Sequence, residues 1–137
     1  CLLSTDDARA TIEGSNKEFV RFYAHNAGAM NLVAQSSQFS KELAVRQMQI
    51  AKQMDGRNRR FLEALLAKNM IPPLDDVEYT AAAIAAMFTR FCHAPFVEGF
   101  YEVTDDNREE IIERATKTLN LMTLRMVGLN QANSAED

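Results

Sequence analysis

The chain has few residues that favour turns, with only 5 glycines and 3 prolines among 137 residues. A β-sandwich or barrel needs a turn about every ten residues, usually marked by glycine or proline. Apolar side chains instead recur at intervals of three and four, the spacing of an amphipathic α-helix. The sequence therefore predicts an all-α fold, an antiparallel bundle of about five helices in one domain covering residues 1–137.

The first three predicted helices are separated by short breaks. The first runs from Ser4 or Asp7 to about His25, and a short second helix over 29–35 follows the break at Asn26-Ala27-Gly28. The third spans about 38–68 and must stop before Pro72-Pro73, because proline cannot continue a helix.

The start of the fourth predicted helix is the clearest boundary. Asp75 as N-cap places Glu78 at the third helical position, which is the pattern of a capping box. Leu74 and Tyr79 then occupy the hydrophobic-staple positions. Pro95 must end or kink this helix.

The fifth predicted helix begins near Asn107. Asn107 and Glu110 have the spacing of a second capping box, and Gly128 marks the end of the helix.

The last two predicted helices are apolar on more than one side. Such helices are either buried centrally in the monomer or covered by a second copy in a C2 dimer. We favour the dimer, because the two helices are consecutive and both are affected. The candidate interface residues are Ala83, Met87, Ala115, Leu119, Met122 and Met126.

Aromatic side chains suggest an apolar ligand pocket, although such stripes often form ordinary core. The candidate pocket residues are Phe22, Tyr23, Phe61, Phe88 and Phe91. The middle of the third helix is polar, from Gln47 to Arg57. That pattern fits the lining of a partly wet cavity or an exposed surface helix equally well.

Charge and cysteine content exclude several classes of protein. The net charge is -4 and no basic stripe is present, which argues against direct reading of duplex DNA. The longest apolar run, Ala81 to Phe88, is too short to span a membrane, and no signal peptide is recognisable. Cys1 and Cys92 define no disulfide framework, so a cytoplasmic location is expected.

No catalytic or metal-binding motif is present. The two histidines, His25 and His93, lack a glutamate three residues earlier, so the di-metal bundle motif is missing. No zinc pattern, nucleophile elbow or phosphate-binding loop occurs. We expect no enzyme activity, metal or cofactor, and structural roles for both histidines.

Three segments carry a family resemblance: residues 19–26 (FVRFYAHN), 61–75 (FLEALLAKNMIPPLD) and 81–91 (AAAIAAMFTRF). Over about Thr11 to Leu129, the chain resembles the C-terminal domain of tetracycline-repressor-like (TetR family) regulators. The resemblance implies that the last two helices form a four-helix bundle with those of a second subunit. It also implies a pocket for a small hydrophobic effector that controls DNA binding.

The chain departs from that family in two respects. The N-terminal helix-turn-helix is missing, so we expect a fragment of a longer protein that reaches operator DNA only through the missing domain. Pro95 is the second departure. Two other functions stay open: a stand-alone helical-bundle interaction protein without ligand, and a small enzyme that uses His25 or His93.

Overall fold

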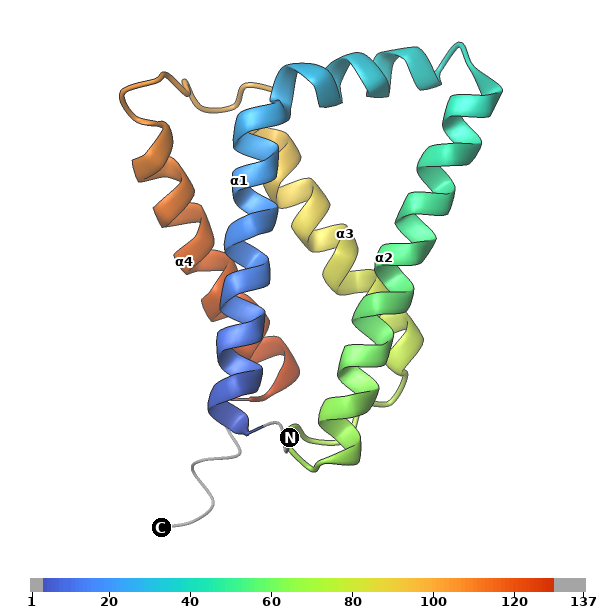
Figure 1. Cartoon of the computed structure of the whole chain (residues 1–137), viewed down its shortest axis with the longest axis vertical. Coiled ribbons are helices and arrows are strands. Elements are labelled where there is room, and N and C mark those ends of the chain that lie inside the picture. Colours follow the sequence, from blue (N-terminus) through green and yellow to red (C-terminus); the bar gives the residue numbers. More distant parts are fainter. Residues whose placement is uncertain (1–3, 130–137) are drawn as a thin grey trace.

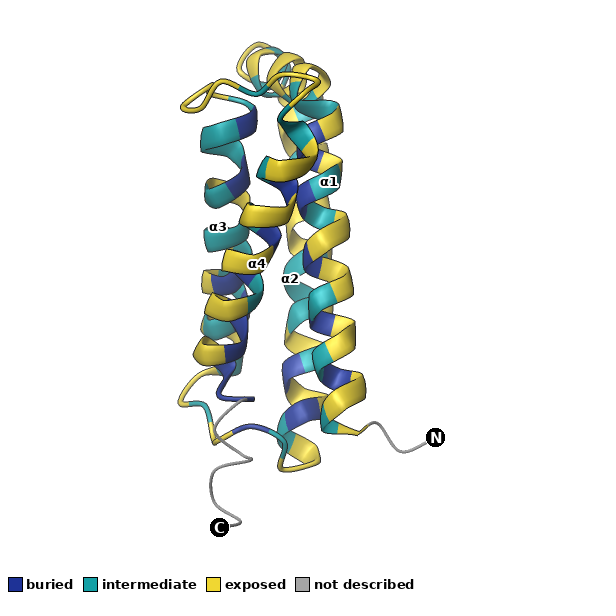
Figure 2. Cartoon of the chain, turned by 90° about the vertical axis from the view of Figure 1, so that its left-hand side faces the viewer, coloured by how far each residue is buried: buried dark blue, intermediate teal, exposed yellow. Residues whose placement is uncertain are grey.

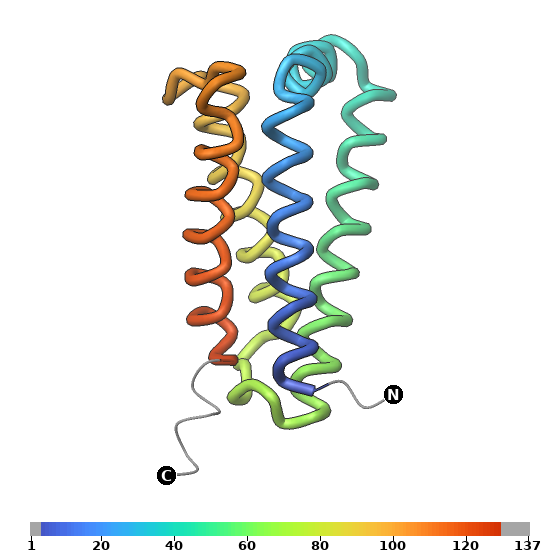
Figure 3. The backbone as a smooth tube through the Cα atoms, turned by 60° about the vertical axis from the view of Figure 1, so that its left-hand side comes forward, coloured from blue at the N-terminus to red at the C-terminus, as the bar shows by residue number. Residues whose placement is uncertain are grey.

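The computed structural model describes residues 4–129, and within them the fold is all-α (Figure 1). Its helices are α1 (Thr5–Ser37), α2 (Lys41–Ala67), α3 (Val77–Phe96) and α4 (Arg108–Val127). The fold class is as predicted, but the described residues form four helices rather than five. Figure 3 shows α2, α3, α4 and the first part of α1 running roughly in one direction, with the end of α1 lying across them.

The predicted first and second helices are joined in α1 by a kink at Asn26. Its backbone angles, φ −121° and ψ 17°, are not helical. The Asn26 side-chain amide donates to the carbonyl of Phe22 at 2.9 Å, a local bond of the kind that competes with regular helix. Beyond the kink, α1 crosses to the start of α2 (Figure 1). The predicted break is therefore a bend within one helix.

The cap of α3 lies one residue later than predicted. Asp76, not Asp75, is the N-cap, and its carboxylate accepts from the backbone N–H of Tyr79 at 2.9 Å. The capping box and staple predicted around Asp75 are therefore wrong, and the Tyr79 side chain is 77% exposed. An N-cap carboxylate accepts from the backbone N–H of the second or third helical residue. Asp75 and Asp76 carry the same group, so local sequence does not decide between them.

The N-cap of α4 is Asn107, as predicted, but the predicted capping box does not form. Asn107 precedes the helix but makes no side-chain capping bond. Its carboxamide oxygen accepts from the backbone N–H of Thr104 at 2.7 Å instead. The predicted capping box with Glu110 is therefore absent.

The helix ends follow the predicted signals. Asn69, just after α2, has φ 54°, and Gly128 after α4 has φ 80°, both in the left-handed region that ends helices. Pro95 lies in the last turn of α3, which ends one residue later at Phe96. Proline thus ends this helix rather than bending its middle.

Two core clusters hold the helices together. The first core cluster contains Ala8, Ile12, Leu62, Leu65, Ile71, Ala81, Ile84, Leu124, Val127 and Leu129. The second core cluster contains Val20, Tyr23, Ala24, Cys92, Phe96, Ile112 and Leu119. Only the C-terminal half of α2 joins a core, through Leu62 and Leu65. Buried positions consequently line the inner sides of α1, α3 and α4, as Figure 2 shows.

Candidate functional site

A polar layer separates the two core clusters. On α1 the buried positions Ala8, Ile12, Asn16, Val20 and Ala24 follow at intervals of four, and Asn16 is the polar member. It is 3% exposed. Because isolated buried amides are costly, Asn16 must find its partners on another helix.

Those partners come from α4. The Asn16 side-chain amide donates to Oδ1 of Asn120 at 2.9 Å and, more weakly, to Oγ1 of Thr123 at 3.4 Å. Thr123 is also buried, and its hydroxyl donates to the carbonyl of Leu119 at 2.7 Å. The layer thus ties α1 to α4 by hydrogen bonds between residues more than a hundred positions apart.

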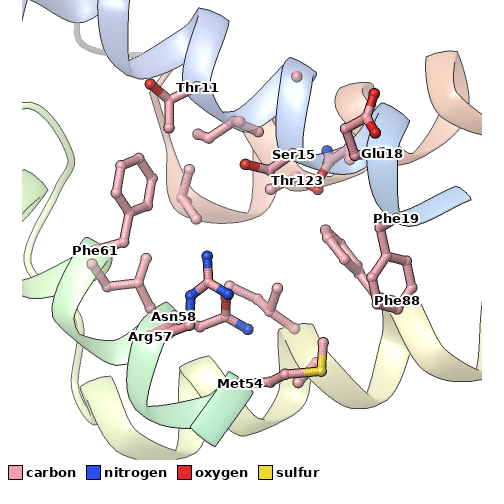
Figure 4. Close-up of a pocket in the computed structure, with 17 residues that line it drawn as sticks. Thr11, Ser15, Glu18, Phe19, Met54, Arg57, Asn58, Phe61, Phe88 and Thr123 are labelled. Atoms are coloured by element: carbon pink, nitrogen blue, oxygen red, sulfur yellow. Dashed lines mark hydrogen bonds between the residues drawn. The ribbon is translucent and has the colours of Figure 1, made fainter. Parts of the chain in front are cut away.

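A cavity of about 670 Å³ borders this layer, between α1, α2, α3 and α4 (Figure 4). That volume lies within the range of small-molecule sites. Its apolar lining comes from every helix and includes Ile12, Phe19, Met54, Phe61, Leu62, Ile84, Ala85, Phe88 and Val127. The rings of Phe19 and Phe88 pack with centroids 5.8 Å apart. Polar and apolar groups therefore share one concave space.

Two charged residues line this cavity, Arg57 on α2 and Glu18 on α1. Both are exposed, so they lie at the rim. In Figure 4 the Arg57 guanidinium extends from α2 towards α1, whereas the Glu18 carboxylate is turned away from it. Among residues 4–129, neither side chain has an ion-pair partner within 4 Å.

The predicted pocket residues separate into three groups. Phe61 and Phe88 line the cavity. Tyr23 and Phe91 do not line it, and they pack in or against the second core cluster. Phe22 is 56% exposed and belongs to neither. Helical spacing alone does not distinguish these positions, since each lies on an apolar stretch of its helix.

Sequence reasoning missed the two buried polar residues of the cavity, Asn16 and Thr123. A signal for Asn16 was present, because a polar residue interrupts a four-residue apolar repeat. The polar middle of α2 was predicted either to line a cavity or to face solvent. Arg57 lines the cavity, whereas Gln49 and Gln53 are exposed surface positions.

The outer sides of α3 and α4 leave apolar groups uncovered. We call this set the outer face: Tyr79, Ala83 and Ala86 of α3, with Leu121, Met122 and Met126 of α4. Leu121, Met122 and Met126 are 44%, 46% and 42% exposed. Figure 2 shows exposed positions along both α3 and α4.

The predicted interface residues lie partly on this outer face. Ala83, Met122 and Met126 belong to it. Leu119 is 1% exposed and is a member of the second core cluster, so its own chain already covers it. Met87 and Ala115 are half-buried against the same cluster. The exposed apolar side of α4 therefore contains Leu121, Met122 and Met126, and does not include the predicted Leu119.

Buried titratable groups lie away from the cavity. Burial raises the pKa of the Cys92 thiol to about 12. Burial is also the main cause that raises the pKa of the Tyr23 hydroxyl, with Cys92 nearby as a second cause. A thiol held in its neutral form is a poor nucleophile, so Cys92 packs as a small apolar residue of the second core cluster. Cys1 lies outside the described residues.

Each histidine approaches one glutamate. Nε2 of His25 is 3.9 Å from Glu109, and Nε2 of His93 is 4.0 Å from Glu98. Both pairs lie away from the cavity lining. In the part of the chain that the structure describes, no three histidine, cysteine or acidic residues are grouped closely enough to hold a metal ion.

No protein-family model matches the chain, and no curated protein or solved structure matches it either. None of the helices within residues 4–129 has the length and apolarity needed to cross a membrane.

Proposed function

We propose that this chain is the effector-binding and dimerisation domain of a TetR-type transcriptional regulator. Three features support the proposal: the resemblance of segments 19–26, 61–75 and 81–91, the cavity among the helices, and the outer face of α3 and α4. Operator binding would belong to a separate helix-turn-helix domain, and the effector would be a small, largely apolar molecule.

The observation that carries the proposal is the outer face. A helix at the edge of a monomer normally presents a polar side to water. Here two consecutive helices both present apolar groups, and alanines at 83 and 86 would allow another helix to approach closely. Covering both helices by the same pair from a second copy would produce a four-helix bundle with C2 symmetry.

The contacts of α1 suggest how a ligand would influence that dimer. α1 lines the cavity and is bonded to α4 at two levels, through Asn16–Asn120 at 2.9 Å and through Arg21–Glu109 at 3.4 Å. A ligand that prefers one spacing of α1 and α2 would favour one placement of α1 against α4. The mechanism would be a population shift between two arrangements.

Sedimentation velocity at micromolar concentration tests the dimer. The parent chain should sediment as a dimer, and Met122→Glu should weaken the dimer about a hundredfold or more, because each copy would bury an unpaired carboxylate. Met48→Glu is the matched control, since Met48 is 58% exposed on α2 and lies away from the outer face. Circular dichroism establishes that both variants fold.

Two results would contradict the proposal. One is a folded monomer in the parent chain, and the other is equal loss of dimer in Met48→Glu and Met122→Glu. A dimer that binds no small molecule in a thermal-shift screen would favour the alternative, a helical-bundle interaction protein without ligand.

A further inference from the structure

Arg57 gives the cavity a single positive charge. The residues three and four positions away on α2, where helical ion pairs form, are Gln53, Met54, Arg60 and Phe61. None of these four residues is acidic, and Arg60 carries a second positive charge. The Arg57 guanidinium extends into the space between α2 and α1 (Figure 4). A planar guanidinium of this kind matches a carboxylate with two parallel hydrogen bonds.

Asn16 gives the inner wall an unused acceptor. Its amide nitrogen already donates to Asn120 and Thr123, and the Thr123 hydroxyl has donated its hydrogen to Leu119. Within residues 4–129, Oδ1 of Asn16 accepts no hydrogen bond. A residue only 3% exposed that borders the cavity with a free acceptor favours a ligand that carries a hydrogen-bond donor.

Apolar side chains line the cavity alongside Arg57, Asn16 and the other polar lining residues, which are Thr11, Ser15, Glu18, Asn58 and Thr123. Phe61 and Leu62 come from α2, and Ile84 and Phe88 come from α3. They would contact the body of a ligand by burial of apolar surface, which is non-directional. The polar groups would determine its orientation.

We propose that the cavity binds an organic acid with an extended apolar body and a hydroxyl or N–H group remote from its carboxylate. The carboxylate pairs with Arg57 at the rim, and the remote donor reaches Oδ1 of Asn16. The Glu18 carboxylate is turned away from Arg57, so it does not compete for the guanidinium. This inference rests on the proposed effector-binding function and names the chemical class of the effector.

Calorimetric titration with four ten-carbon probes tests the ligand class: decanoate, decanoate with a terminal hydroxyl, decanediol with both hydroxyls terminal, and decylammonium. The hydroxy acid should bind most tightly. Decanoate should bind more weakly, because it lacks the donor for Asn16. The diol should bind about fivefold more weakly than the hydroxy acid, because it lacks the charge for Arg57.

Variants separate the contribution of each group. Arg57→Gln should reduce the affinity for the hydroxy acid about fivefold and leave the affinity for the diol unchanged. Arg60→Gln is the matched control, since Arg60 does not line the cavity, and it should change neither. Asn16→Ala should remove the preference for the hydroxy acid over decanoate, while Glu18→Gln should leave or raise the affinity for both acids.

The outcomes distinguish this inference from the proposed function. Equal binding of acid and diol, unaffected by Arg57→Gln, would overturn the assigned ligand class and leave an effector pocket in place. Tighter binding of decylammonium, abolished by Glu18→Gln, would overturn it in favour of a cationic ligand. If no probe binds the folded parent chain, the assigned ligand class is overturned, and the thermal-shift screen then decides whether the cavity binds any effector at all.

Discussion

Replacing Asn16 with alanine should destabilise the domain through its link to α4. The substitution removes the hydrogen bonds to Asn120 at 2.9 Å and to Thr123 at 3.4 Å. The Asn120 carboxamide then loses its donor at a part-buried position, whereas the Thr123 hydroxyl keeps its bond to Leu119. The substitution therefore removes one strong and one weak hydrogen bond.

The expected magnitude follows from these two bonds. A buried hydrogen bond contributes about 1 kcal/mol net, and the longer bond contributes less. Asn16 already borders the cavity, so the space left by its side chain joins existing space and adds little further cost. The free energy of unfolding should fall by about 1.5 kcal/mol, and the Tm by about 5 °C for a domain of this size.

Urea unfolding followed by circular dichroism measures this loss at one fixed protein concentration. A double-mutant cycle with Asn120→Ala should give a coupling energy of about 1 kcal/mol. Asn58→Ala is the control, because Asn58 lines the cavity but makes no side-chain hydrogen bond within residues 4–129. A coupling below about 0.3 kcal/mol would refute the assignment of Asn16–Asn120 as the link between α1 and α4.

Leu65→Ala should lower the free energy of unfolding by about 3 kcal/mol in urea, because Leu65 is fully buried in the first core cluster. Gly14→Ala should raise it by about 0.5–1 kcal/mol, since an added Cβ meets no atom within 4 Å in a helix, and Gly99→Ala, at φ 71°, should lower it by about 1 kcal/mol. In a Cys1→Ser background, Cys92 should resist aromatic disulfide reagents near neutral pH until urea unfolds the chain, because its pKa is about 12. Below pH 9.0 the Cys92 thiol is neutral in both the folded and the unfolded chain. Between pH 9.0 and about 12 it ionises only in the unfolded chain, so the free energy of unfolding should fall as the pH rises through this range.

The sequence by itself determined the helical segments and most of their ends. The bend at Asn26, the stop at Asn69 and the stop at Gly128 depend on backbone preferences within a few residues. All three lie at the predicted positions, although Asn26 bends α1 rather than ending it. The cap of α3 was missed by one position, because Asp75 and Asp76 offer the same carboxylate to the same kind of helix start. The apolar excess on the last two helices was also readable, since periodicity reports how many sides of a helix are apolar.

Only the tertiary structure decided which apolar side faces inward and what the cavity contains. Leu119 lies in the second core cluster and Met122 outside it, although both belong to one apolar arc of α4. Asn16 is readable as a polar interruption, but its partner Asn120 lies 104 residues away. Local rules act over one helical turn, whereas packing brings together side chains from distant turns, so the composition of a site shared by four helices is a property of the folded chain.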